Sequence, residues 1–208
     1  MILKASIELT VDKLSLSRGA LTLIHDLNLN LHSGGMLWLT GPNGIGKTTL
    51  LMALANLLRP DEGTIHWLIE NQPVPPKVAL TYAAHRGVER NGLTLGEDLS
   101  FWQKAYSDDT SLSDRLEQVG LTGREETPVA GLSAGQRRRL SLARLLSSNR
   151  PAWLMDEPLA GLDHEGRKLV TDALSTHLRH GGLAIIASHH PVQVQDVEAR
   201  KLVLEPGS

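Results

Sequence analysis

The chain has 208 residues and a mass of 22.6 kDa, which is enough for one large α/β domain or two small lobes with a buried core. Its 21 Lys and Arg against 23 Asp and Glu give a formal net charge of −2, so no basic field is available to hold nucleic acid, and we expect no nucleic-acid partner. The chain has no cysteine, which excludes disulfides, thiolate metal sites and covalent haem attachment through paired cysteines.

The first predicted elements are short extended segments. Residues 1–10 lack the apolar core and cleavage site of a signal peptide, and no run approaches the roughly 18 apolar residues of a membrane-spanning helix, so we expect a soluble, cytoplasmic protein. Alternation of apolar and polar residues predicts strands over residues 7–16 and 27–31. An apolar run over residues 36–39 predicts a further strand, and residues 47–58 are expected to form a helix.

Between that strand and that helix lies a glycine-rich segment that fits the phosphate-binding pattern G-x-x-x-x-G-K-[S/T]. Its residues are Gly41, Pro42, Asn43, Gly44, Ile45, Gly46, Lys47 and Thr48. The glycines let backbone N–H groups converge on phosphate oxygens, Lys47 can reach the outer phosphates, and Thr48 offers a hydroxyl to Mg²⁺. We therefore predict that this loop, with Thr49, binds a nucleoside triphosphate; a plain glycine-rich turn is the alternative.

The middle of the chain changes from strands to helices. Residues 64–69 predict a strand, residues 71–77 contain three prolines and predict a loop, and residues 78–82 resume an extended pattern. Helical patterns then follow without an intervening strand, and they predict a helical lobe at about residues 87–150, inserted in an α/β core. These patterns cover residues 96–106, 112–119 and 134–147.

Strand and helix alternate again in the C-terminal part, as a parallel sheet requires. The expected strands cover residues 152–155, 183–187 and 202–204, and the expected helix covers residues 165–180. The first of these strands ends at Asp156 and Glu157, at the carboxyl edge where open α/β sheets bind ligands. We predict that Asp156 holds Mg²⁺ and that Glu157 orients or deprotonates an attacking water. A strand-end turn before Pro158 is the alternative.

A capped helix start precedes this acidic pair. Ser133 is a good N-cap, and Gly135 lets the backbone approach an anion closely, so the segment predicts a second phosphate-binding nest. With Leu132 before them, Ser133, Ala134, Gly135 and Gln136 resemble the signature of the ABC ATPases.

Two further segments agree with this resemblance. Residues 160–163 resemble the D-loop of the ABC ATPases, and His189 resembles their switch histidine. We prefer His189 to the adjacent His190, because a small residue, Ser188, stands before it. The resemblance implies that His189 hydrogen-bonds the γ-phosphate and helps to position the attacking water, as an imidazole can at neutral pH.

The resemblance implies an α/β fold of the P-loop NTPase type, an ABC-type nucleotide-binding domain with an antiparallel β subdomain and an inserted helical lobe. Residues 1–208 then form a single domain, and ATP and Mg²⁺ are its cofactors. Glu157 and His189 are the implied catalytic residues, and Thr48 and Asp156 the implied metal ligands. In the ATP-bound state a homodimer is implied, in which each ATP lies between the phosphate loop of one chain and residues 133–136 of the other.

The chain departs from the family pattern at two places. After the strand that ends near Tyr82, the family carries a glutamine, whereas residues 83–87 contain none and offer His85 or Arg86 instead. The aromatic residue that stacks on adenine is also missing near residues 14–19. Arg18 could stack its guanidinium there, or be an ordinary exposed arginine of a turn.

Several segments together resemble one subfamily, the ATPase subunits of haem exporters in cytochrome c maturation. They are the pair Arg18 and Gly19, Tyr82 with His85, and residues 93–102. The resemblance implies a peripheral protein on the cytoplasmic face of the bacterial inner membrane. It also implies a CcmB-like integral membrane permease and other cytochrome c maturation proteins as partners. ATP hydrolysis would then drive release of a haem-loaded chaperone.

Other functions remain as alternatives. The chain could be the ATPase subunit of another small ABC transporter, or a soluble ABC ATPase of repair or translation, although it lacks the coiled-coil insertions or tandem copies of that group. It could also be a nucleotide-responsive binding module without turnover, or a P-loop kinase, which would leave residues 133–136 unexplained.

Three side-chain groups are interpreted without a catalytic role. His177 and His180 are expected to be a solvated surface pair, and we assign no haem site. Residues 101–102, an aromatic pair, could anchor a partner or pack inside the helical lobe. Residues 137–139, three arginines, are expected to form a solvated turn of helix, although one of them could support the neighbouring phosphate site.

Overall fold

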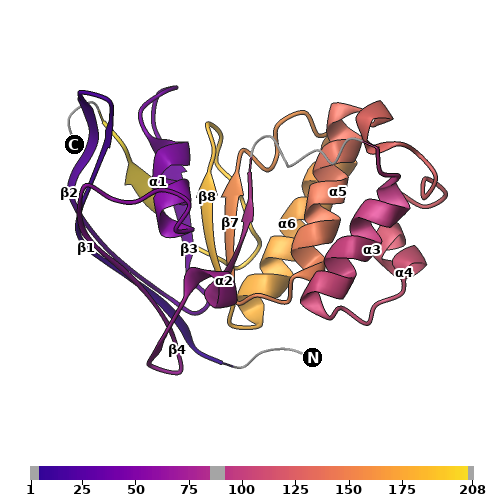
Figure 1. Ribbon diagram of the computed structural model, residues 1–208, viewed down its shortest axis with the longest axis horizontal. Coiled ribbons are helices and arrows are strands. Elements are labelled where there is room, and N and C mark those ends of the chain that lie inside the picture. Colours follow the sequence, from indigo (N-terminus) through magenta and orange to yellow (C-terminus); the bar gives the residue numbers. More distant parts are fainter. Residues whose placement is uncertain (1–4, 85–91, 206–208) are drawn as a thin grey trace.

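The computed structural model describes residues 5–84 and 92–205, and its strands form two sheets with one helix between them (Figure 1). The first sheet is antiparallel, in the order β2-β1-β4-β5. Its strands are β1 (Ile7–Arg18), β2 (Leu21–His32), β4 (Glu62–Ile69) and β5 (Gln72–Val74).

The second sheet is parallel, in the order β6-β7-β8-β3-β9. Its strands are β3 (Met36–Thr40), β6 (Leu80–Ala83), β7 (Ala152–Asp156), β8 (Leu183–Ala187) and β9 (Ala199–Val203). Because strand side chains alternate between faces, Ile185 packs into one apolar core and Ile186 into the other. Strands β7 and β8 are buried along their whole length, as the apolar runs in the sequence predict for a parallel sheet covered on both faces.

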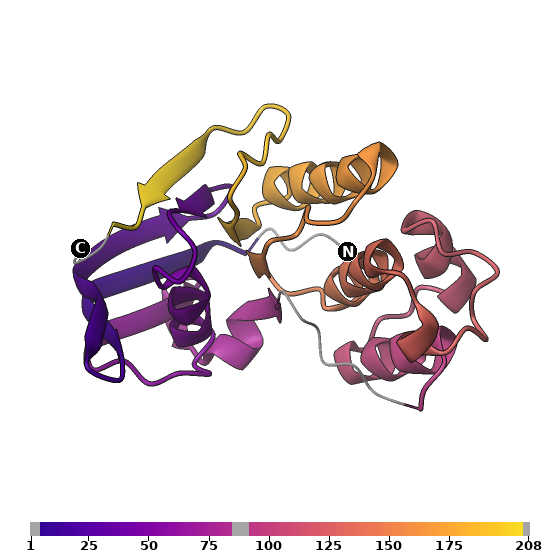
Figure 2. The same ribbon diagram turned by 90° about the horizontal axis from the view of Figure 1, so that it is seen from above.

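Helices cover both faces of this parallel sheet (Figures 1 and 2). Helix α1 (Lys47–Leu54) lies between the two sheets and contacts β7 and β8. Helices α5 (Ala134–Ser147) and α6 (His164–Arg179) contact the sheet through β6 and β8, with α3 (Leu95–Tyr106) and α4 (Leu112–Gln118) packed against α5. The one-turn elements are α2 (Pro76–Ala79) and the 3-10 helix η1 (Val129–Gly131). None of the helices within residues 5–84 and 92–205 is long and apolar enough to cross a membrane.

The architecture confirms the predicted α/β class, with an antiparallel sheet beside a parallel one. Along the chain, α3, α4, η1 and α5 follow one another between β6 and β7, where the sequence predicts helices. Helix α1 is shorter than predicted, because it ends at Leu54 and Asn56 then adopts a positive φ of 58°.

Two predictions for the segment after β4 are wrong. Residues 71–77 are not all loop, since β5 forms there as an edge strand, where Pro73 removes no hydrogen bond that a second neighbour would need. Residues 78–82 are not all extended, because α2 runs to Ala79 with Pro76 in its first turn, and β6 begins only at Leu80.

Candidate active site

A cavity of about 750 Å³ lies where the carboxyl ends of β3 and β7 meet the start of α1. The phosphate-loop residues that line it are Asn43, Gly44, Gly46, Lys47, Thr48 and Thr49. Asp156, Glu157 and His189 line the same cavity, although they come from two other parts of the chain. The structure therefore brings the three sequence-separated groups of predicted site residues together, as parallel strands that end at one edge allow.

The loop needs glycine at two of its positions. Gly41 has a φ of 144°, and a Cβ there would lie 2.5 Å from the carbonyl oxygen of Leu204. Gly46 has a φ of 118°, and a Cβ there would lie 3.1 Å from Cβ of Leu23. Gly46 is also the N-cap of α1, and because it has no side chain, the first N–H groups of the helix are left for a ligand.

Lys47 is buried at the mouth of the helix. Its Nζ donates to the carbonyl oxygens of Gly41 at 2.7 Å and Pro42 at 2.9 Å. Burial lowers the pKa of Lys47, and the negative charges of Glu157 and Asp156 act against that shift. Among the described residues, the ammonium thus donates to two neutral carbonyls, and a phosphate oxygen would be a stronger acceptor for it.

The Thr48 hydroxyl donates to Oδ2 of Asp156 at 2.7 Å, and Asp156 is 4% exposed. Mg²⁺ in phosphate-transfer sites takes one or two protein oxygens and completes its shell with phosphate and water oxygens. These two oxygens beside the phosphate loop fit that requirement. Within the described parts of the chain no group of three or more His, Cys, Asp or Glu could hold a metal without a phosphate.

Glu157 and His189 contact each other at the other side of the cavity. The backbone N–H of His189 donates to Oε1 of Glu157 at 3.1 Å, and Nε2 of His189 lies 3.6 Å from the same oxygen. Glu157 has a positive φ of 51°, and its N–H donates to the carbonyl of Ala187 at 2.8 Å, so the β7 and β8 ends hold it in a sparsely populated conformation. His190 does not line this cavity, whereas His189 does.

Residues 133–136 form the capped helix start that the sequence predicts. Gln136 N–H donates to Oγ of Ser133 at 3.2 Å, and Ser133 N–H donates to Oε1 of Gln136 at 2.9 Å. None of the four residues lines the cavity around the phosphate loop. They lie instead beside Gly161, whose carbonyl oxygen would be 3.5 Å from a Cβ on Gly135. The structure therefore does not bring the two predicted phosphate sites together within one chain.

The prediction of a solvated turn at residues 137–139 is wrong. All three arginines are half-buried, and Arg139 donates to Oδ1 of Asp163 at 3.2 Å. Arg138 lines a small cavity together with Asp156, where burial lowers its pKa and the charges of Asp156 and Glu157 oppose the shift. The spacing could have revealed this, because Arg138 stands four residues before Leu142 on the apolar face of α5.

Tyr82 and Arg18 lie in the same cavity, and the sequence predicts neither of them as a catalytic or phosphate-binding residue. Tyr82 lines it, and burial, with the charge of Asp156 as a second cause, raises the pKa of this phenol to about 12. Arg18 also lines the cavity and is exposed, so stacking on a base and an ordinary turn arginine both agree with its position. His85 and Arg86, the candidates for the missing glutamine, lie outside the described residues.

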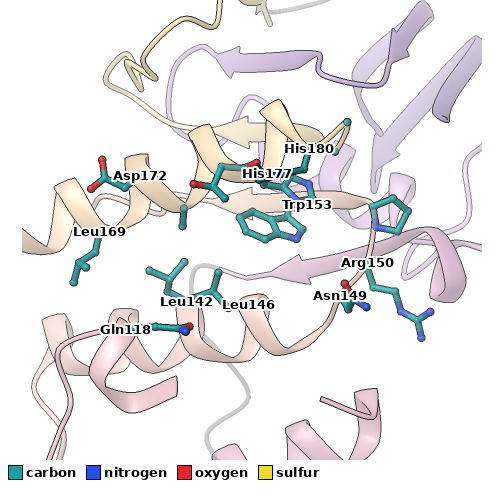
Figure 3. A pocket seen from close by; sticks show the side chains of 15 residues that line it. Gln118, Leu142, Leu146, Asn149, Arg150, Trp153, Leu169, Asp172, His177 and His180 are labelled. Carbon is teal, nitrogen blue, oxygen red and sulfur yellow. Dashed lines mark hydrogen bonds between the residues drawn. The ribbon is translucent and has the colours of Figure 1, made fainter. Parts of the chain in front are cut away.

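The interpretation of His177 as a solvated residue is also wrong. The imidazole stacks on Trp153 with ring centroids 3.9 Å apart, beside a second cavity of about 480 Å³ between α5 and α6 (Figure 3). Burial lowers the pKa of His177 to about 4. Trp153 points from β7 towards α6, and Gly182 leaves the room that the imidazole fills. His180 is exposed, as expected.

The two aromatic residues at positions 101–102 differ in their burial. Trp102 is half-buried and stacks on Tyr106 with ring centroids 5.6 Å apart, whereas Phe101 is 43% exposed. Packing within the helical segment accounts for Trp102, whereas the exposure of Phe101 agrees with the interpretation as a partner contact.

Comparison with known proteins gives one family. A family model described as ABC transporter matches residues 24–160. The chain is 41% identical over 198 residues to a protein of Rhodobacter capsulatus, covering 95% of this chain and 87% of that one. It is 39% identical over 191 residues to one of Haemophilus influenzae, covering 89% and 90%. Both relatives are named cytochrome c biogenesis ATP-binding export protein CcmA.

Solved structures agree on the fold. The chain is similar, with a TM-score of 0.83 and 22% identity, to an ATP-binding subunit of an ABC transporter, over 96% of this chain and 86% of that one. It is also similar, with a TM-score of 0.81 and 21% identity, to a dimeric ATP-binding cassette in a post-hydrolysis state bound to ADP and Pi, over 96% and 95%. At this identity the likeness concerns the fold alone, and it confirms the predicted type of α/β fold.

Proposed function

This chain belongs to the ABC transporter family, and on that premise we propose that it is the ATP-hydrolysing subunit of a membrane export complex in cytochrome c biogenesis. As an ABC ATPase it binds nucleotide and converts ATP and water to ADP and phosphate. The observation that carries the proposal is the convergence of the phosphate loop, Asp156, Glu157 and His189 on one cavity.

The phosphate loop, the acidic pair and His189 each take a role in the proposal. The backbone N–H groups of the loop, which every residue from Gly41 to Thr49 except Pro42 carries, and the Lys47 ammonium hold the phosphates of ATP. Thr48 and Asp156 would hold Mg²⁺, which when bound neutralises charge on the phosphates. Glu157 orients the attacking water and accepts its proton, and His189 donates to the γ-phosphate from beside it.

The second half of the ATP site comes from another copy of the chain in this proposal. Residues 133–136 present a helix N-terminus that their own phosphate loop does not reach, so each ATP in a head-to-tail homodimer would touch both chains. ATP would then close the dimer, and loss of the γ-phosphate would loosen it.

The export role rests on the relatives. Both relatives described above are named for export in cytochrome c biogenesis, and each match covers most of both chains. These matches favour the cytochrome c pathway over another small ABC transporter or a soluble ABC ATPase. In the proposal, residues 1–208 are one ATPase domain with a helical lobe at about 87–150. The domain lies on the cytoplasmic face of the bacterial inner membrane, against a CcmB-like permease. Its hydrolysis of ATP is coupled to release of a haem-loaded chaperone or to other haem handling.

Two measurements test the proposal. Phosphate release by the purified chain, alone and with the permease, should be lost in Glu157→Gln while ATP affinity stays within about twofold, because only the proton acceptor has changed. Unchanged release would remove hydrolysis from this site. The chain should also restore cytochrome c maturation in a bacterium that lacks its own ATPase subunit, and failure there with turnover intact would overturn the export role alone.

A further inference from the structure

The peptide group between Ser188 and His189 is held by hydrogen bonds on both of its sides. Its N–H donates to Oε1 of Glu157 at 3.1 Å, and its carbonyl oxygen accepts from Nε1 of Trp38 at 3.0 Å. In a trans peptide the N–H and C=O groups point in opposite directions, so Trp38 and Glu157 lie on opposite sides of this one plane. The indole and the proposed catalytic carboxylate therefore act on the same rigid unit.

The position of Trp38 makes this contact well defined. Trp38 belongs to β3, three residues before Gly41, and pairs with Ile186 of β8. Ser188 is 2% exposed, and its N–H donates to the carbonyl of Leu39 at 3.1 Å. The strand that leads into the phosphate loop thus binds both backbone groups of Ser188, one through its main chain and one through the indole.

The indole contact also affects the donor that faces Glu157. A peptide carbonyl that accepts a hydrogen bond polarises its own N–H, which strengthens the bond that the N–H donates. Without the indole, the buried Ser188 carbonyl would lose a donor, and one restraint on rotation of the peptide would disappear. Rotation of that peptide would move the His189 N–H away from Glu157 and change the direction of the imidazole.

We propose that Trp38 is a positioning residue for hydrolysis. Its indole N–H holds the peptide between Ser188 and His189, and that peptide in turn sets the orientation of Glu157 and His189. This inference rests on the proposed roles of Glu157 and His189. Trp38 does not line the cavity at the phosphate loop, so its effect falls on the rate of hydrolysis and not on ATP affinity.

The test separates the indole N–H from the bulk of the ring. The full chain would carry Trp38→Phe or, by unnatural amino-acid incorporation, 3-benzothienylalanine at position 38, which keeps the bicyclic shape and lacks the N–H. The matched control is Lys201→Met, because Nζ of Lys201 lies 5.0 Å from the Trp38 ring centroid and its removal leaves the N–H in place. Turnover, ATP affinity and thermal unfolding would be measured for each.

We expect kcat to fall about tenfold to a hundredfold in both position-38 variants, with ATP affinity within twofold, because misplacement of a catalytic group by 1 Å costs up to about 10²-fold. Lys201→Met should keep the wild-type kcat. The benzothienyl chain excludes misfolding as the cause, since its ring fills the same space. Wild-type kcat in that chain, or equal losses of kcat and ATP affinity, would overturn the inference.

A second readout does not depend on turnover. In a proton–nitrogen correlation NMR spectrum, the indole N–H cross-peak of Trp38 should shift when Glu157→Gln weakens the hydrogen bond from the His189 N–H. An unmoved cross-peak would contradict the coupling between the two hydrogen bonds of this peptide. Glu157→Gln also separates the two proposals. If it keeps full turnover, the proposed function itself fails; if it loses turnover while the position-38 variants do not, only the role of Trp38 fails.

Discussion

Two helix starts in this chain are predicted to bind phosphate, and they are built in opposite ways. Helix α1 begins after Gly46, which has no side chain to offer, so its first N–H groups are available to a ligand. Helix α5 begins after Ser133, and a reciprocal pair of hydrogen bonds with Gln136 already occupies part of its end. The N–H groups at the start of α1 therefore need a ligand as their acceptor. The start of α5 already has side-chain acceptors, so it leaves fewer N–H groups for a ligand.

The comparison predicts that the ATP affinity of a single chain depends on the start of α1 and not on the start of α5. Lys47→Ala should give the largest effect, a loss of ATP affinity of about a hundredfold or more, because a charge-assisted contact to phosphate is lost from a buried position. Isothermal titration with ATP would measure it, with circular dichroism to confirm an intact fold. Retained tight binding would contradict the role given to Lys47.

Two glycine substitutions, one at each helix start, compare the contributions of α1 and α5 to ATP affinity. Gly46→Ala places a Cβ on a residue with a positive φ of 118° and brings it against Leu23. We therefore expect the free energy of ATP binding to become less favourable by about 2 kcal/mol or more. Gly135→Ala meets nothing nearer than 3.5 Å, and ATP affinity of the single chain should stay unchanged while turnover falls. Equal losses of affinity in both variants would break the comparison.

His177, near the C-terminal end of α6, provides a test of pH dependence that changes neither helix start. The folded chain holds the His177 pKa at about 4, below the ordinary value of 6.5, so the unfolded chain takes up a proton first as the pH falls. The stability contributed by neutral His177 is therefore complete above pH 6.5 and is lost between about pH 6.5 and 4, by about 2–3 kcal/mol.

Urea unfolding of the wild-type chain and of His177→Phe across this range would measure that difference. The phenylalanine keeps an aromatic ring on Trp153 and cannot titrate, so its stability should change less with pH. If both proteins lose stability equally over the range, His177 does not bind its proton as the burial of its ring predicts.

The smallest expected effect concerns the cap of α5. Ser133→Ala removes one acceptor at the helix start and should destabilise the fold by about 1 kcal/mol. ATP affinity of the single chain should not change, whereas turnover, which is proposed to need this end in a dimer, should fall. Ser111→Ala, which removes the similar cap of α4 away from the site, is the control, and equal turnover in the two variants would count against the dimer.

Sequence reasoning succeeded where the relevant residues are contiguous. The phosphate loop, the acidic pair at 156–157 and the cap at Ser133 each depend on neighbours within a few positions, and the structure has the predicted local geometry at each. The contact between Trp38 and Ser188 joins residues 150 positions apart, and no local pattern signals it. The burial of His177 likewise depends on Trp153 from another strand, so the histidine spacing alone suggested a surface pair.

Asp163 accepts two hydrogen bonds that connect it to both helices. One comes from the N–H of Gly166 in the first turn of α6 at 2.8 Å, and the other from the guanidinium of Arg139 in α5 at 3.2 Å. It stands only six positions after Glu157, and Gly161 of the same short segment lies against residues 134–135. In the proposed dimer, a rotation of α5 would therefore move the segment that leads from Asp163 back to Glu157, the proposed water-activating carboxylate. The six residues after Glu157 would then connect the proposed contact between two chains to the proposed site of hydrolysis.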